Sequence, residues 1–136
     1  MIDAAVRASM KELAVDIRIG CIKALESIGI GHVGGSFSVC DLMAVLYGGV
    51  MNVRPEEPRW EGRDRLIISK GHAGPAMYAA LALRGFFPYE QLLTLNKPGT
   101  DLPSHTDRQK TPGVDMTTGS LGQGFSSALG SRWPAS

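Results

Sequence analysis

The chain has 136 residues, of which 43% are hydrophobic and 20% charged, and its formal net charge is +1. This length fits one domain, and its interleaved charges give neither the basic patch of a nucleic-acid-binding protein nor an attraction to acidic membranes. No stretch approaches the roughly 20 apolar residues of a membrane span, and the N-terminus lacks a secretion signal. We therefore expect a soluble, cytoplasmic protein, with Cys21 and Cys40 as reduced, buried thiols.

The first half of the chain predicts helices. From Asp3 to about Ser27, apolar residues recur at helical spacing, which predicts a long amphipathic helix ended by Gly29 and Gly31. Its apolar stripe consists of Val6, Met10, Leu13, Ile17, Cys21, Leu25 and Ile28. A glycine-rich turn follows at residues 31–35, and a second helix is expected to run to about Tyr47. Residues 52–64 are polar and contain two prolines, which is typical of a surface loop.

The second half of the chain alternates loops with short elements. Residues 65–69 (Arg-Leu-Ile-Ile-Ser) predict one buried parallel strand, followed by a turn and a helix over 75–84. One more short helix is expected at 88–95, then a long loop over 97–118 and a brief helix ending at Gly130. The pattern predicts an α/β protein whose parallel sheet is incomplete, since only one strand is clear.

All three histidines, His32, His72 and His105, lie beside glycine or small residues in predicted loops. Taken singly, a loop histidine is more often a surface or hydrogen-bonding residue than a catalytic one. Glycine neighbours let a ligand approach the backbone, however, and an imidazole exchanges protons near neutral pH. His72 also follows the predicted strand at its carboxyl end, where open α/β sheets bind ligands. A zinc site built from the three histidines is an alternative, although none belongs to a His-x-x-x-His pair.

A glycine-rich turn at residues 119–124 (Gly-Ser-Leu-Gly-Gln-Gly) leads into the last predicted helix. Such turns present backbone N–H groups to phosphate, helped by the helix N-terminus. A tight turn packed against a strand would use the same glycines, so the pattern alone does not decide between the two. The residues by themselves indicate an α/β fragment with an anion-binding turn and three loop histidines.

Three segments, taken in order, closely resemble the start of the transketolase family. They are residues 31–36 (Gly-His-Val-Gly-Gly-Ser), 64–73 (Asp-Arg-Leu-Ile-Ile-Ser-Lys-Gly-His-Ala) and 111–124 (Thr-Pro-Gly-Val-Asp-Met-Thr-Thr-Gly-Ser-Leu-Gly-Gln-Gly). The first is most similar to the split transketolases, in which two polypeptides share the work. The resemblance implies an α/β thiamine-diphosphate-binding domain and the transfer of a two-carbon ketol unit between sugar phosphates, as in pentose phosphate metabolism.

The same resemblance implies roles for six residues. It places His32 and His105 among the groups that hydrogen-bond substrate hydroxyls and assist proton transfer. It places His72 beside the diphosphate and the reacting centre, both as a catalytic and as a cofactor-binding residue. The remaining three residues match the loop that lies against the cofactor: Gly119, Ser120 and Leu121. Three neutral imidazoles around a carbonyl are suited to general acid–base catalysis near pH 7.

The sequence departs from the family at its end. The family continues into a strand carrying Gly-Asp-Gly, whose carboxylate holds the metal, whereas residues 131–136 resemble nothing in it. We therefore expect a partial, truncated domain over 1–130 and a tail over 131–136. No metal ligand is assigned, and Mg²⁺ or Ca²⁺ would bind only with ligands from a partner, such as a second transketolase chain.

We accordingly expect the isolated chain to bind thiamine diphosphate weakly and to catalyse no ketol transfer. Because the apolar stripe of the first helix and one edge of the predicted strand would lack cover, we also expect aggregation or partial unfolding. Two alternatives to an enzyme component remain: a non-catalytic remnant of a transketolase and a protein-interaction module.

Overall fold

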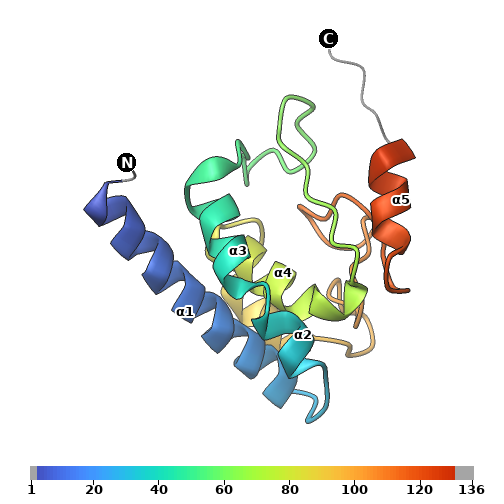
Figure 1. Ribbon diagram of the computed structural model, residues 1–136. Coiled ribbons are helices and arrows are strands. Elements are labelled where there is room, and N and C mark those ends of the chain that lie inside the picture. The colour runs from blue at the N-terminus through green and yellow to red at the C-terminus, as the bar shows by residue number, and fades with distance from the viewer. Residues whose placement is uncertain (1–2, 131–136) are drawn as a thin grey trace.

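Every regular element in the described part of the chain is helical. The computed structural model describes residues 3–130, and its α-helices are arranged as Figure 1 shows. In chain order the elements are α1 Ala4–Glu26, α2 Val33–Phe37, α3 Cys40–Val45, the π-helix η1 Leu46–Val50, the 3₁₀ helix η2 Gly71–Ala73, α4 Gly74–Leu83, the 3₁₀ helix η3 Tyr89–Thr94 and α5 Gln123–Gly130. Long loops join η1 to η2 and η3 to α5.

The predicted strand at residues 65–69 is wrong, and with it the α/β class and its one buried parallel strand. Residues 3–130 contain no β-strand. A strand exists only through a ladder of hydrogen bonds to a neighbouring strand. Here the Leu66 N–H donates instead to Asp115 Oδ2 at 2.8 Å, and the Ser69 carbonyl accepts from the Gly122 N–H at 2.9 Å. The apolar run is thus held by a side chain and a turn.

Helix α1 confirms the long amphipathic helix. Asp3 caps it by accepting a hydrogen bond from the Ala5 N–H at 3.1 Å, and Gly29 follows it with a φ of +70°. Only the second half of its predicted stripe is core: Ile17 and Leu25 are buried, whereas Val6 is 43% exposed. The expectation that the stripe would lack cover is therefore wrong from Ile17 onward, because α3 and α4 pack against that half.

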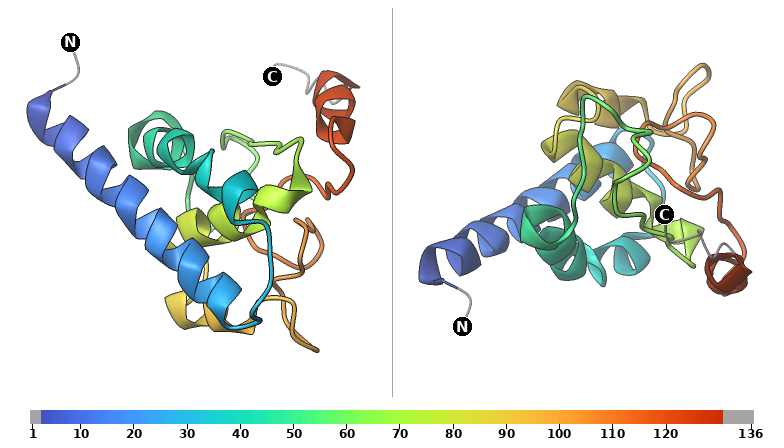
Figure 2. Two further views of the ribbon diagram at one scale, coloured as in Figure 1. Left: turned by 60° about the horizontal axis from the view of Figure 1, so that its bottom comes forward. Right: turned by 90° about the horizontal axis from the view of Figure 1, so that it is seen from above.

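Helix α4 is the centre of the core. It is apolar on all sides, and every residue from Gly74 to Ala82 is buried, as expected for a helix surrounded by other elements. Its neighbours are α1, α2, α3 and η3, and the views in Figure 2 show it enclosed by them. Gly20 of α1 lets the two helices approach closely, since a Cβ at that position would lie 2.8 Å from Ala79 Cβ.

Contrary to the sequence-based expectation, one stretch, residues 33–50, is long and apolar enough to cross a membrane by length and composition, with a mean hydropathy of 1.4. It consists of three consecutive helices, α2, α3 and η1. Its inner side supplies Cys40, Met43 and Tyr47 to the core, where it packs against α1 and α4. These contacts favour a core segment, a type of helix that passes the same test.

Helix α5 lies at the periphery, on the far side of the molecule from the start of α1 (Figures 1 and 2). Gly124 holds it against the 67–69 segment, since a Cβ there would lie 2.8 Å from Ser69 Cα. Three apolar side chains of the turn and helix point outward, each more than 60% exposed: Leu121, Phe125 and Leu129. The predicted tail over 131–136 lies outside the described residues.

Candidate active site

The three histidines come together, although 40 and 33 residues separate them along the chain. His32 immediately precedes α2, His72 lies in η2, and His105 lies in the loop between η3 and α5. The ring centroids of His32 and His72 are 4.6 Å apart and those of His72 and His105 are 4.7 Å apart, both edge to face. The fold thus forms a row of three imidazoles with His72 in the middle.

Two contacts fix α2 against η2 and thereby position His32 and His72. Lys70 Nζ donates hydrogen bonds to the Gly35 carbonyl at 2.9 Å and to Ser38 Oγ at 2.7 Å. The space between the two histidines requires glycine at position 35, because a Cβ there would already touch both histidine Cβ atoms at 3.9 Å. Lys70 had no role in the sequence-based prediction, and the only signal was its place in the Ser-Lys-Gly-His segment.

His105 is positioned by the loop on either side of it. The Tyr78 hydroxyl of α4 donates to the Pro103 carbonyl at 2.8 Å, which ties the loop to the core. On the other side, Thr106 Oγ1 and Thr118 Oγ1 form a buried hydrogen bond of 2.9 Å. The loop predicted over 97–118 is therefore ordered by specific hydrogen bonds immediately before and after the histidine.

The electrostatics of the row favour neutral imidazoles. Partial burial lowers the pKa of His105 from its ordinary value of 6.5, and the nearby His72 and His32 lower it further. His72 Nδ1 is buried and has no hydrogen-bond partner among residues 3–130. A buried polar atom without a partner is costly, so this nitrogen is available to a bound molecule.

The glycine-rich turn lies directly against the turn that carries His72. A Cβ on Gly71 would lie 2.2 Å from the Thr118 carbonyl oxygen and 2.9 Å from Gly119 Cα, so the two backbones touch. The Gly122 N–H already donates to the Ser69 carbonyl, whereas the N–H groups of residues 119–121 have no partner within the described range. The structure therefore brings the predicted cofactor-binding residues Gly119, Ser120 and Leu121 to the same region as the histidines.

Two properties define the class of this site. A row of imidazoles can exchange protons, and an adjoining turn with free N–H groups can accept an anionic group. Within residues 3–130, no group of three His, Cys, Asp or Glu side chains is placed to hold a metal ion. The site is that of an enzyme domain which combines proton transfer with the binding of an anionic ligand.

Comparison with known proteins identifies the family. The family model described as "Transketolase, thiamine diphosphate binding domain" matches residues 9–133, and the chain therefore belongs to the transketolase family. Over 114 residues it is 59% identical to the 6-deoxy-6-sulfo-D-fructose transketolase subunit SqwG of Clostridium sp. (strain MSTE9), covering 84% of this chain. It is 39% identical to the transketolase of Treponema pallidum over 123 residues, covering 90% of this chain.

Solved transketolases share the fold of the described residues. The enzyme from Leishmania mexicana superposes with a TM-score of 0.85 at 34% identity, over 90% of this chain and 18% of that one. The enzyme from Campylobacter jejuni gives a TM-score of 0.82 at 29% identity, over 95% of this chain and 20% of that one. The chain spans 42% of the length of the Clostridium subunit and 19% of the Treponema enzyme.

The residues present fit part of thiamine diphosphate. The unpartnered His72 Nδ1 and the free N–H groups of residues 119–121 offer hydrogen-bonding capacity to its polar atoms. Gly119 has no other atom within 4 Å of where its Cβ would stand, which leaves room for a ligand against the backbone. The family and these groups agree on the thiamine diphosphate-binding domain.

Proposed function

We propose that this chain supplies the histidine-bearing part of a transketolase active site, which transfers a two-carbon ketol unit between sugars that carry an anionic group. Bound thiamine diphosphate supplies the carbon nucleophile and the electron sink for this transfer. The single observation that carries the proposal is the row formed by His32, His72 and His105 beside the glycine-rich turn.

The outer two histidines bind the substrate and move protons. In this proposal His32 and His105 donate hydrogen bonds to sugar hydroxyls, and one of them accepts the hydroxyl proton released when the carbon–carbon bond breaks. The lowered pKa of His105 keeps its imidazole neutral near pH 7 and therefore able to act as a base. His72, between them, faces the cofactor with its free Nδ1.

The glycine-rich turn positions the cofactor. Gly119, Ser120 and Leu121 lie against it, and their N–H groups bind it without a side chain in the way. A metal ion, Mg²⁺ or Ca²⁺, would take its ligands from a partner chain, as would the acid that activates the cofactor. The isolated 136-residue chain is accordingly expected to catalyse no ketol transfer.

The substrate is a ketose whose last carbon carries phosphate or sulfonate. The Clostridium relative is named a subunit and acts on 6-deoxy-6-sulfo-D-fructose, which supports both a cytoplasmic split enzyme and a sulfonated sugar as candidates for this chain. Sugar phosphates, the donors of the wider family, are the other candidate.

The test combines this chain with the second subunit of a split transketolase, thiamine diphosphate and Mg²⁺. Ketol transfer is measured with fructose 6-phosphate and with 6-deoxy-6-sulfofructose as donors. His32→Ala and His105→Ala should each lower kcat by roughly 10²–10⁴-fold, the usual contribution of general acid–base catalysis. Arg7→Gln, an exposed change on α1, is the control and should leave the rate unchanged.

Two outcomes would contradict the proposal. Full activity of both histidine variants would show that the row takes no part in catalysis. Tight association with the second subunit but no transfer of either donor would favour the interaction module instead, for which the exposed Leu121, Phe125 and Leu129 supply apolar surface.

A further inference from the structure

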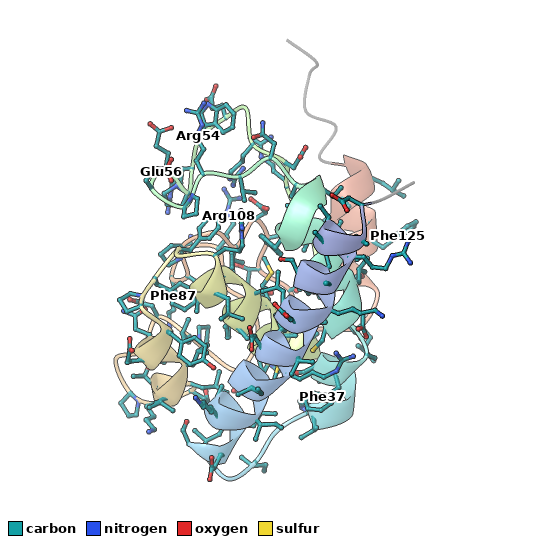
Figure 3. The ribbon with its side chains drawn as sticks, turned by 90° about the vertical axis from the view of Figure 1, so that its left-hand side faces the viewer. Phe37, Arg54, Glu56, Phe87, Arg108 and Phe125 are labelled. Atoms are coloured by element: carbon teal, nitrogen blue, oxygen red, sulfur yellow. The ribbon has the colours of Figure 1, made fainter. Side chains whose placement is uncertain are left out.

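A second concave site lies away from the histidines. A hollow of about 310 Å³ opens between two loops, residues 58–65 and residues 108–115, and none of its lining residues belongs to the histidine row or to the 119–124 turn. Figure 3 places Arg108 close to the first loop, which also carries Arg54 and Glu56. The sequence had assigned both segments to loops without a function.

The lining of this hollow is strongly basic. Five cationic side chains face two carboxylates there, an excess of three positive charges in a chain whose total is +1. The cations are Arg59, Arg63, Arg65, Arg108 and Lys110, and the carboxylates are Glu61 and Asp115. The rest of the chain therefore carries a net negative charge. A concave surface lined by one sign of charge concentrates ligands of the opposite sign.

The floor of the hollow contains a buried arginine with spare hydrogen-bonding capacity. The Arg63 side chain is 11% exposed, its Nε donates to the Pro58 carbonyl at 2.8 Å, and its Nη2 pairs with Asp115. Its Nη1 is buried and has no hydrogen-bond partner within residues 3–130. Because Asp115 also accepts from the Leu66 N–H, the one carboxylate that meets Arg63 is already shared. A buried guanidinium nitrogen in this state favours an added acceptor.

The rim carries mobile charges on a fixed backbone. The side chains of Arg108 and Lys110 are exposed, while the Arg108 N–H is held by Thr117 Oγ1 at 3.1 Å. The Thr111 hydroxyl donates to the Asp101 carbonyl, which fixes the loop from its other side. Arginine forks match the oxygen atoms of phosphate and sulfonate, and a volume near 300 Å³ suits a small molecule.

We propose that this hollow binds a small molecule through a phosphate or sulfonate group. The site is independent of the proposed ketol transfer, because it involves neither the histidines nor the glycine-rich turn. Arg108 and Lys110 capture the anion at the rim, and Arg63 presents a fixed positive charge from below.

The test uses the whole chain and NMR. Sodium phosphate and sodium methanesulfonate are titrated separately, with sodium chloride at equal ionic strength as the reference. We expect saturable shifts in the amides of residues 59–65 and 108–115. The variant Arg108→Gln/Lys110→Gln should weaken the apparent Kd by about tenfold, since it removes two charge-assisted contacts. The matched control, Arg7→Gln/Lys11→Gln, removes the same charge from the exposed side of α1 and should stay within about twofold.

All four substituted residues are exposed, so circular dichroism of both variants should match the unsubstituted chain. Saturable binding of either anion at the hollow, lost in the first variant only, supports the proposal, and comparison of the two titrations tells phosphate from sulfonate. Shifts no larger than those with chloride would overturn it. Equal weakening in both variants would also overturn it, as would shifts confined to the histidine row.

Discussion

The contact between the two functional turns can be broken by one methyl group. In Gly71→Ala the new Cβ would lie 2.2 Å from the Thr118 oxygen, 2.7 Å from its carbonyl carbon and 2.9 Å from Gly119 Cα. Ordinary contact begins at 3.4 Å, so the oxygen and the methyl group must separate by about 1.2 Å. All three atoms belong to the backbone and cannot rotate away. Gly71 is not among the glycines of positive φ, so this clash is the only cost of the substitution.

The expected loss of stability follows from this geometry. Overpacking a well-packed site typically costs about 1–3 kcal/mol, and we expect a value near 3 kcal/mol because a backbone must move. The same movement would disturb the buried hydrogen bond between Thr118 and Thr106, next to His105. The free energy of unfolding is measured by urea denaturation with circular dichroism. Gly34→Ala is the control, since nothing lies within 4 Å of its added Cβ and alanine favours a helix by up to about 1 kcal/mol.

Two results would refute this reasoning. If Gly71→Ala unfolds within about 0.5 kcal/mol of the unsubstituted chain, the turns are not in the contact described. If Gly34→Ala loses as much stability, the effect belongs to glycine replacement in general. An unchanged NMR signal of His105 in a destabilised Gly71→Ala variant would separate the clash from the histidine row.

Three further predictions concern titration, reactivity and a hydrogen bond. His105 should titrate below 6.5 by NMR, and His72→Ala should raise its pKa by removing a neighbour and some cover; an unchanged pKa would contradict this. Because the folded chain then binds fewer protons, the His105 contribution should make stability rise with pH from its lowered pKa to about 6.5, and a flat profile in His105→Ala is the control. Burial raises the pKa of the Cys21 thiol, so thiol reagents at pH 8 should label it slowly, and much faster in urea. Tyr78→Phe removes the hydrogen bond to the Pro103 carbonyl and should cost about 1 kcal/mol in urea denaturation; an unchanged midpoint would count against that bond.

Local signals in the sequence were sufficient for the long helices. The predicted helix over 3–27 corresponds to α1, Ala4–Glu26, because its cap, periodicity and terminal glycines are all local features. The predicted helix over 75–84 corresponds to α4, Gly74–Leu83, with proline in its first turn. The motifs around the histidines were also sufficient to identify the transketolase family.

The predicted strand at 65–69 failed for a physical reason. A continuous apolar run shows only that a segment will be partly buried, whereas strand formation depends on a partner elsewhere in the chain. In the structure, the partners of this segment are the Asp115 carboxylate and the turn at Gly122. Neither is encoded within the segment, so no periodicity in it could have revealed them.

The sequence by itself therefore determined the main helices and the residue types of the candidate site. Tertiary structure decided which of these residues meet. The distance of 4.6 Å between the His32 and His72 rings depends on how α2 packs against η2 through Lys70 and Gly35. The basic hollow likewise requires two loops separated by more than 40 residues to close over Arg63. Such contacts arise from packing between distant segments, which local patterns along the chain do not record.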